Sequence, residues 1–353
     1  MSTSRISEQP GATWTDQPST PHPDAQLTGG GWESDRVAEG AQRVVAAVEQ
    51  VVLGKPHVVR TAVMTLIAGG HLLVEDVPGV GKTVLAKALA RAVDCSVSRV
   101  QFTPDLLPSD VTGVTVYDRR TAEFDFRPGP VFANMVVADE INRASPKTQS
   151  ALLECMEEHQ VTVDSTTYSL AEPFMVLATQ NPVEMEGTYP LPEAQRDRFT
   201  TRISLGYPHP EAELAMIDTH SSSDPVERVR PVCTAADVRA MIDAARSVHM
   251  SPELQRYVVE LVSNTRSSPH VRLGASPRAT LHLVRSARAW AAMAGRTHVL
   301  PDDVKEVGAA VLSHRLLLTP QARGSGPTPG EVVSQLLAKL VVPRGHPARH
   351  GQR

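Results

Sequence analysis

The chain has 353 residues and a nearly even charge balance, with 35 Lys and Arg against 39 Asp and Glu and a formal net charge of −4. This length is typical of about two domains, and the charge balance argues against a dedicated nucleic-acid binder, which is usually strongly basic. Aromatic residues make up only 4% of the chain, which disfavours base-stacking platforms for single strands.

The cysteines and histidines do not indicate a metal or redox site. Cys95, Cys155 and Cys233 are far apart and form no CxxC pair, so neither a zinc knuckle nor a redox motif is indicated. We expect them to be small buried hydrophobic residues in a reducing cytosol. The 13 histidines include no HExxH pair, so a zincin-type site has no support.

The N-terminal region shows no targeting or membrane signal. Residues 1–31 are rich in Ser, Thr, Pro, Gly and Gln and lack an apolar core, so we expect residues 1–34 to be a disordered tail rather than a secretory signal. The most apolar long stretch, 61–74, is interrupted by polar residues and glycines and falls short of the ~18 residues of a membrane span. We expect a soluble, cytoplasmic protein.

Helices and strands alternate through the first 208 residues. Apolar residues at helical spacing predict a helix over 36–52 and a second over 57–68, which ends at Gly69-Gly70. Short apolar runs predict strands at 71–74, 99–102, 135–138, 174–178 and 201–205. This order predicts an α/β core with a mostly parallel sheet over residues 35–208.

Two hairpins interrupt this pattern, and the second half of the chain is different. Period-2 alternation predicts strand pairs at 114–117 with 124–126 and at 161–163 with 167–170. From 231 to about 317 the patterns are helical, so we expect an all-α domain over residues 209–343. We expect a loop at 319–330 and a polar, basic tail at 344–353.

One helix of the second domain has a clear start. Ser276 suits the N-cap and Pro277 the first helical position. Its apolar stripe would comprise Leu281, Val284, Ala287 and Ala291.

A glycine-rich loop follows the strand predicted at 71–74 and precedes an apolar helix. It comprises Asp76, Val77, Pro78, Gly79, Val80, Gly81, Lys82 and Thr83, and Val84 continues into the helix. Small residues let backbone N–H groups turn inward around phosphate oxygens, and the helix N-terminus adds the positive end of its dipole. Lys82 can then reach the β- and γ-phosphates of ATP, and the Thr83 hydroxyl can bind Mg²⁺. The first position of this pattern is usually glycine, whereas here it is Asp76; an ordinary turn with a surface lysine is the alternative.

The strand predicted at 135–138 ends in two carboxylates, Asp139 and Glu140. This is typical of a Walker B element, in which Asp139 would hold Mg²⁺, directly or through water, and Glu140 would orient and deprotonate the attacking water. A solvated strand end is the alternative. The position 57 residues after Lys82 (139 − 82) favours the Walker B interpretation.

Three further polar residues are candidates for the same reaction. Asn181 follows the strand at 174–178 and can hydrogen-bond the γ-phosphate or the water, although an asparagine before proline is as often a turn residue. Arg198 can act from a neighbouring subunit as an arginine finger; a solvated helix end is the alternative. Arg278 would lie in the first turn of its helix, where a cation is mildly unfavourable, so a role toward phosphate from the side of the second domain is favoured.

These elements occur in the order expected of AAA+ ATPases, and the local sequence closely resembles the MoxR-type family of the helix-2-insert clade. The resemblance spans about residues 36–318 and is carried by the segments 71–83, 138–154, 178–182, 186–195 and 273–279. It implies a P-loop AAA+ core, a helical lid, ATP and Mg²⁺ as cofactors, and assembly into a homo-oligomeric ring, often a hexamer.

The resemblance also implies roles for single residues. Asn181 matches the sensor 1 position, Arg278 the sensor 2 position and Arg198 the finger, with Arg196 and Arg143 as alternative fingers. Residues 101–129 resemble the helix-2 insert, and 161–170 resemble the pre-sensor hairpin. Members of this family look like chaperones that remodel or mature partner proteins, commonly ones with von Willebrand factor A domains, and some act in metal-cofactor insertion.

Two other functions remain open on the sequence. A nucleotide-binding switch with little turnover would need a defective base or finger, yet Glu140 and Arg198 are both present. A nucleic-acid motor conflicts with the charge balance, but a basic C-terminal stretch keeps it in view. That stretch comprises Arg315, Arg323, Lys339, Arg344, Arg349 and Arg353.

Overall fold

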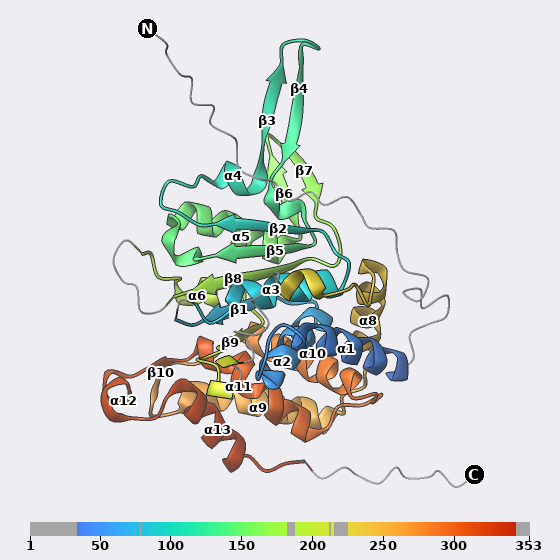
Figure 1. Cartoon of the computed structure of the whole chain (residues 1–353). Coiled ribbons are helices and arrows are strands. Elements are labelled where there is room, and N and C mark those ends of the chain that lie inside the picture. Colours follow the sequence, from blue (N-terminus) through green and yellow to red (C-terminus); the bar gives the residue numbers. More distant parts are fainter. Residues whose placement is uncertain (1–33, 78, 182–187, 212, 215–224, 344–353) are drawn as a thin grey trace, which may run out of the picture.

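A computed structural model describes residues 34–343, except 78, 182–187, 212 and 215–224 (Figure 1). The tails predicted at 1–34 and 344–353 therefore lie outside the described residues, apart from Ser34. Pro78 of the glycine-rich loop and Pro182 after Asn181 lie outside them too.

The core is a five-stranded parallel sheet in the order β2-β5-β8-β1-β9. Its strands are β1 (Leu72–Glu75), β2 (Val97–Gln101), β5 (Met135–Asp139), β8 (Met175–Gln180) and β9 (Thr201–Ile203). All five predicted strands are confirmed, with shifted ends. The strand β8 runs two residues further than predicted, because Thr179 and Gln180 pair with Val74 and Glu75 of β1.

Both faces of this sheet are covered, which explains the uniformly apolar strands. On β5, Met135 and Val137 join one hydrophobic cluster, whereas Val136 and Ala138 join the other, as the alternation of side chains requires. The helix α3 (Lys82–Ala92) packs on the first face and α5 (Pro146–Glu158) on the second. The helices thus fix the segments that precede and follow them at the ends of the strands.

Both predicted hairpins are confirmed. One is β3 (Gly113–Asp118) with β4 (Glu123–Pro128), which follow the short helix α4 (Pro108–Thr112), and the other is β6 (Gln160–Val163) with β7 (Thr166–Ser169). Figure 1 shows β3 and β4 projecting away from the body beyond β2. The base of this hairpin requires glycine at Gly113, which has φ +100° and where a Cβ would lie 2.5 Å from the carbonyl oxygen of Arg127.

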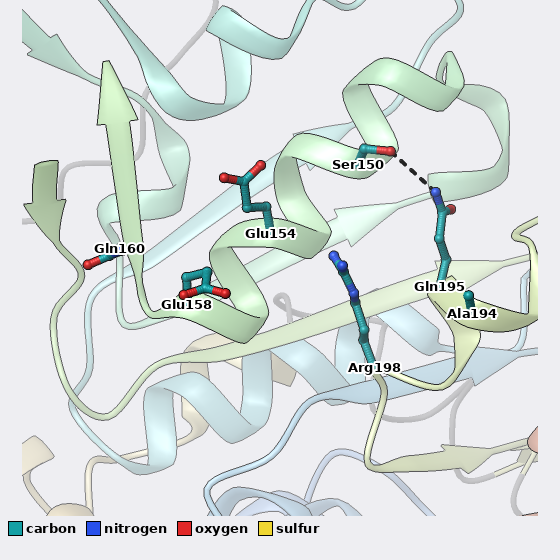
Figure 2. A pocket seen from close by; sticks show the side chains of 7 residues that line it. All are labelled: Ser150, Glu154, Glu158, Gln160, Ala194, Gln195 and Arg198. Carbon is teal, nitrogen blue, oxygen red and sulfur yellow. Dashed lines mark hydrogen bonds between the residues drawn. The ribbon is translucent and has the colours of Figure 1, made fainter. Parts of the chain in front are cut away.

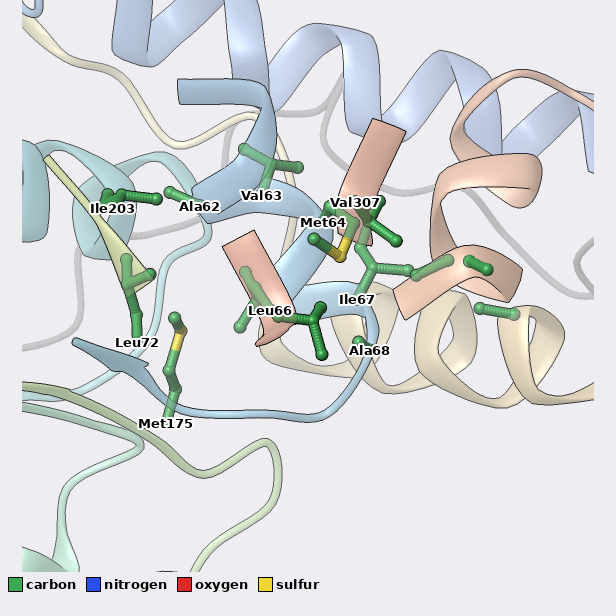
Figure 3. Packing of buried hydrophobic residues seen from close by; sticks show 14 of the residues in the cluster. Ala62, Val63, Met64, Leu66, Ile67, Ala68, Leu72, Met175, Ile203 and Val307 are labelled. Carbon is green, nitrogen blue, oxygen red and sulfur yellow. The ribbon is translucent and has the colours of Figure 1, made fainter. Parts of the chain in front are cut away.

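Seven further helices among the described residues gather beside the β9 edge of the sheet (Figure 1). They are α1 (Ser34–Glu49), α2 (Pro56–Ile67), α8 (Ala235–Ser247), α9 (Pro252–Ser267), α10 (Pro277–Met293), α11 (Pro301–Leu312) and α13 (Pro329–Lys339). Figure 3 shows side chains of α2 packed between Leu72 and Ile203 of the strands and Val307 of α11. The first two helices share one hydrophobic cluster with the C-terminal helices, so the domain boundary predicted at 208 is not a break in packing.

Several details differ from the sequence predictions. The second domain is mainly helical but contains a two-stranded sheet of β10 (Val271–Leu273) and β11 (Leu317–Leu318). The loop predicted at 319–330 is wrong in part, because α12 (Pro320–Ser325) lies within it. The capping of α10 by Ser276 is confirmed. Its predicted stripe is wrong at Leu281, which is 58% exposed, while Leu283 is buried.

The cysteines are free thiols, as expected from their spacing. Cys155 and Cys233 are buried and Cys95 is half-buried, and burial raises the pKa of Cys95 and of Cys155 to about 12. They therefore stay protonated at neutral pH. Among the described helices, none is both long enough and apolar enough to cross a bilayer.

Candidate functional site

The glycine-rich loop joins the carboxyl end of β1 to the start of α3. Gly79 has φ +83° and Gly81 has φ +93°, and a Cβ at either position would meet no atom within 4 Å. Backbone conformation, not crowding, thus requires glycine here. Gly81 is the N-cap of α3 in the left-handed region, so the loop and the helix N-terminus together offer N–H groups to an anion such as the phosphates of ATP.

Lys82 lies at the centre of this loop. Its Nζ donates hydrogen bonds to the carbonyl oxygens of Asp76 at 2.6 Å and Val77 at 3.2 Å. The ammonium group is therefore held within the loop itself, beside the N-terminus of α3, as a phosphate-binding lysine requires. Val80 and Val84 pack against the hydrophobic cluster and can contribute only through their backbones.

Asp76 fastens the loop to the chain beyond β9. Its Oδ2 accepts hydrogen bonds from the Ser204 hydroxyl at 2.9 Å and the Gly206 N–H at 2.7 Å, and its Oδ1 accepts one from Val77 at 2.9 Å. Burial opposes ionisation, but these hydrogen bonds outweigh it and hold the pKa of the Asp76 carboxyl below its usual value. The side chain thus supports the loop, which accounts for aspartate where the usual pattern has glycine.

Asp139 lies at the carboxyl end of β5 and is 4% exposed. The Thr83 hydroxyl is 3.4 Å from each of its carboxylate oxygens, and the Thr179 hydroxyl is 3.2 Å from Oδ1. The Arg99 Nε donates to Oδ2 at 2.7 Å. Hard oxygen donors from Thr83 and Asp139 side by side fit Mg²⁺, which is held in proteins by one or two such ligands together with phosphates and water.

Glu140 is adjacent in sequence but differently placed. It has φ 56° and ψ 48°, a left-handed conformation that costs free energy for a non-glycine residue and recurs at functional sites. The Thr179 hydroxyl accepts the Glu140 N–H at 3.0 Å. The Glu140 carboxylate is held by Gln101 Nε2 at 2.9 Å and by Arg143 Nε at 3.1 Å. The backbone turn thus separates this carboxylate from Asp139, as distinct base and metal roles require.

Asn181 follows β8, the strand between β5 and β1. It is 5% exposed, and its carbonyl oxygen accepts a long hydrogen bond of 3.4 Å from Asn142. The carboxyl ends of parallel strands meet at one edge of a sheet. The structure therefore brings together the glycine-rich loop, Asp139, Glu140 and Asn181 as the sequence predicts.

Arg198 and Arg278 meet elsewhere, on one shared carboxylate. Arg198 Nε lies 3.1 Å from Glu157 Oε2, and Arg278 Nη2 donates to the Oε1 of the same residue. Glu157 belongs to the last turn of α5, Arg198 to the segment before β9, and Arg278 to the first turn of α10. The two arginines therefore form one cluster, which the sequence did not predict.

This cluster lies at the amino ends of the parallel strands, whereas the glycine-rich loop lies at their carboxyl ends. His71, which precedes β1, hydrogen-bonds the Met156 carbonyl through Nε2 at 3.0 Å, and its own carbonyl accepts the Thr200 N–H at 2.9 Å. The arginine cluster is thus beside the start of β1, whereas the loop follows its end. The five steps from His71 to Asp76 correspond to roughly 16 Å of extended chain.

A cleft of about 500 Å³ adjoins Arg198 at this edge. Figure 2 shows it between α5 and α6 (Glu193–Arg196), with Ser150 and Gln195 joined by a 3.3 Å hydrogen bond. Glu154 and Glu158 also line it, so Arg198 faces a polar wall that carries two carboxylates.

The three candidate fingers differ in their positions and partners. Arg143 pairs with Glu140 of its own chain, so it lies at the edge of the sheet that carries the P-loop. Arg196 ends α6, and its Nε atom is buried with no hydrogen-bond partner among the described residues. Arg198 lies at the far edge beside the cleft.

Sequence reasoning missed Thr179, Arg99, Glu157 and Arg315. The first three carry no signal of their own, because each acts through a partner distant in the chain. Arg315 did carry one: five of the eight residues 311–318 are Val or Leu, and a charge among them is out of place unless it is paired. The sequence grouped it with a basic surface stretch, but it is buried, with 6% exposure, and is not available to nucleic acid.

The chain is similar to known proteins over most of its length. The model of the "ATPase family associated with various cellular activities (AAA)" matches residues 71–201, and that of the AAA lid domain matches residues 263–336. The uncharacterized protein YeaC of Bacillus subtilis is 46% identical over 301 residues, which cover 85% of this chain and 94% of that protein. Chaperone MoxR1 of Mycobacterium tuberculosis is 41% identical over 312 residues, covering 86% of this chain and 82% of that protein. A solved structure of a candidate ATPase from Cytophaga hutchinsonii superposes with a TM-score of 0.82 at 40% identity, covering 88% of this chain and 97% of that one.

Proposed function

Because the chain belongs to the MoxR-type AAA+ ATPase family, we propose that it hydrolyses ATP at sites shared between identical subunits of a ring. The observation that carries this proposal is the placement of Arg198 and Arg278, which share Glu157 at the edge of the sheet opposite the P-loop of their own chain. The strand β1, with roughly 16 Å of extended chain from His71 to Asp76, lies between them and that loop. Both arginines are therefore better placed for a neighbour's nucleotide than for their own.

One subunit supplies the nucleotide-binding half of each site. The P-loop residues 76–84 would cradle the phosphates, with Lys82 against the β- and γ-phosphates, and Thr83 and Asp139 would hold Mg²⁺. The metal would neutralise charge on the phosphates. Glu140 would take the proton of the attacking water, and Asn181 would orient that water or the γ-phosphate.

The next subunit supplies the arginine half. Arg198 would neutralise charge that develops on the transferring phosphoryl group, and Arg278 would act beside it rather than on its own P-loop. Such a contact joins two different edges of the same protein, so it is heterologous and generates a ring when the rotation closes. We propose a hexamer, as the family resemblance implies.

The work of this ring is proposed to be remodelling or maturation of a client protein. Support comes from a relative named as a chaperone, MoxR1 of Mycobacterium tuberculosis, and from the family resemblance. The client class that we propose is a cytoplasmic protein with a von Willebrand factor A domain. Metal-cofactor insertion is the narrower form of this proposal, and the metal content of the client made with and without this chain tests it.

A nucleotide-binding switch is the competing function. It predicts slow turnover that does not depend on Arg198. Glu140, the proposed base, and Arg198, the proposed finger, are both present in the chain, and their presence supports hydrolysis.

Mixed mutant subunits test the shared site. Glu140→Gln removes the base but keeps ATP binding, and Arg198→Ala removes the finger, whose contribution to kcat is typically about 10³–10⁵-fold. Each variant alone is expected to be nearly inactive. An equal mixture should regain turnover, because about a quarter of its sites join an intact Glu140 to an intact Arg198 in a randomly assembled ring.

The matched control is Arg246→Ala, which removes an exposed arginine paired with Asp243 on α8 and should be fully active. If Arg198→Ala is as active as Arg246→Ala, or if the mixture stays inactive, the shared site is wrong.

A further inference from the structure

Arg315 is a buried arginine that contacts the chain segment carrying Arg198. It ends the short helix η5 (Ser313–Arg315), directly after α11, and its side chain is 1% exposed. Burying a guanidinium is costly unless every N–H finds an acceptor. The hydrogen-bond acceptors of Arg315 therefore indicate which segments of the fold it holds together.

Most of these acceptors lie on the chain around Arg198. Arg315 Nε donates to Asp197 Oδ1 at 2.8 Å, and its Nη2 donates to the carbonyl oxygens of Asp197 at 3.1 Å and Phe199 at 2.6 Å. Its Nη1 donates to the Thr200 carbonyl at 3.3 Å. One side chain thus holds the backbone on both sides of Arg198.

One further acceptor, the Val311 carbonyl oxygen, belongs to α11, and the other contacts lead to α10, the helix that carries Arg278. The Ser276 hydroxyl, which caps α10, donates to Asp197 Oδ2 at 2.7 Å. Arg315 Nη2 also donates to Nδ1 of His282 at 2.6 Å, and His282 lies in the second turn of the same helix. Asp197 and Arg315 therefore join the finger segment to the first turns of α10.

The direction of Arg198 depends on this arrangement. The segment 197–200 lies between the short helix α6 and the three-residue strand β9. Its backbone N–H groups bond the carbonyl oxygens of α6 and of His71, whereas three of its own carbonyl oxygens, those of Asp197, Phe199 and Thr200, accept from Arg315. The arginine cluster itself is partly exposed, at 29% for Arg198 and 35% for Arg278. Their shared pairing with Glu157 is exposed to water and contributes little to order by itself.

We propose that Arg315 is a positioning residue that fixes Arg198 and Arg278 relative to one another for the neighbouring subunit's ATP. It does so without contact with nucleotide, by holding the chain around Arg198 and the start of α10 in one unit. This inference rests on the proposed function, since it assumes that Arg198 acts in a neighbour's site.

The test uses mixed rings in which each subunit has one task. Donor subunits carry Glu140→Gln and supply Arg198; acceptor subunits carry Arg198→Ala and supply Glu140. Arg315→Met, which keeps the length of the stem but removes the guanidinium, is placed in the donor or in the acceptor, and turnover is compared with the reference mixture.

A positioning role predicts an asymmetric result. Arg315→Met in the donor should lower turnover roughly 10- to 100-fold, as misplacement of a catalytic group does. In the acceptor it should lower turnover much less, because the finger of that subunit is already absent. A merely structural role would lower both mixtures alike, and equal losses, or no loss in the donor, overturn the inference.

Two further variants serve as a control and as a milder substitution. Arg296→Met removes a half-buried lid arginine, which pairs with Asp303 through both Nη atoms, and should show no donor–acceptor asymmetry. Arg315→Lys keeps the charge with fewer donors, so it should show the same asymmetry at smaller size, and it replaces Arg315→Met if that subunit fails to fold. If the reference mixture itself stays inactive, the shared-site proposal fails first and this inference falls with it.

Discussion

Asp139 and Glu140 are neighbours in the chain, yet their surroundings divide the chemistry between them. Asp139 is buried beside Thr83, whereas Glu140 turns out through a left-handed backbone toward Gln101 and Arg143. The Thr179 hydroxyl touches both residues, because it bonds Asp139 Oδ1 and the Glu140 N–H. This hydroxyl therefore links Asp139, the proposed metal ligand, to Glu140, the proposed base, and fixes their relative placement.

Replacing Thr179 with valine should lower ATP turnover. The Thr179→Val change preserves shape but removes both hydrogen bonds, and loss of a partner behind a metal ligand typically costs about 10- to 100-fold in activity or metal affinity. Turnover measured at saturating Mg²⁺ and ATP checks this. Thr162→Val, which breaks an exposed threonine pair on the β6–β7 hairpin, is the control. Equal activity of the two variants would contradict the role assigned to Thr179.

The Asp76→Asn variant should lower the free energy of unfolding by about 1–3 kcal/mol at pH 7, because a buried ionised acceptor of three hydrogen bonds is lost. The native pKa of Asp76 is below the unfolded value of 3.8. Its stabilisation is therefore present above about pH 4 and is lost as pH falls through the lower native value.

Denaturant unfolding of wild type and Asp76→Asn at pH 7 and near pH 3.5 measures this. The difference between the two proteins should shrink at the lower pH. A difference that grows on acidification would show that the carboxylate is not stabilised in the folded state.

Single residues show where sequence reasoning ends. The roles proposed for Gly79, Gly81, Lys82 and Thr83 could be predicted from the sequence because they depend on local backbone and spacing. The function of Asp76 could not, because its partners Ser204 and Gly206 lie about 130 residues away and are known only from the fold.

At the scale of elements, hydrophobic patterning was sufficient to find the five strands and both hairpins. It failed where burial depends on neighbours. Leu281 and Leu283 are equally apolar and both lie on α10, but only Leu283 faces the other helices. The strands β10 and β11 have three and two residues, too short for alternation to be recognised.

The contact between the end of α2 and the segment before β9 leaves no room for a side chain at Gly70. A Cβ there would lie 2.2 Å from Thr200 Oγ1 and 2.7 Å from Thr200 Cβ. We therefore expect Gly70→Ala to lower the free energy of unfolding by about 1–3 kcal/mol. It should also reduce turnover, since Thr200 is two residues from Arg198.

Gly324→Ala is the matched control, because a Cβ at Gly324 in α12 meets nothing within 4 Å and alanine favours a helix by about 0.5–1 kcal/mol over glycine. Thermal or denaturant unfolding of both variants checks the prediction. Gly70→Ala with wild-type stability would mean that the two segments can separate without cost.

At the scale of the whole molecule, the N-terminal helices, the sheet and the C-terminal helices share one hydrophobic cluster. The sequence could suggest two domains from the change in patterning, but it could not show that α1 and α2 pack against α10. In this arrangement the cluster of Arg198 and Arg278 and the P-loop lie at opposite ends of the strands of one packed body, which suits head-to-tail assembly.

Buried histidines should make the molecule sensitive to mild acid. Burial lowers the pKa of His71 to about 4 and of His282 to about 2, and it also lowers the pKa of His314. In the unfolded chain each takes up a proton below about pH 6.5. Stability is therefore complete above pH 6.5 and falls as pH decreases, by up to about 1.4 kcal/mol per pH unit for each histidine.

Unfolding midpoints measured between pH 7.5 and pH 5.5 check this expectation. Asp and Glu carboxyls ordinarily titrate near pH 4, below this range, so a decline here reports mainly on histidine. A midpoint that stays constant or rises toward pH 5.5 would contradict the buried neutral state.

The central claim is that each ATP site is completed by a second copy of this chain. The most direct measurement is ATP turnover per subunit as a function of protein concentration, with molar mass followed by light scattering on the same samples. We predict that turnover per subunit rises with concentration and reaches a plateau as the ring assembles, and that Arg198→Ala assembles equally but stays inactive. Turnover that is independent of concentration, or an active monomer, would contradict the account.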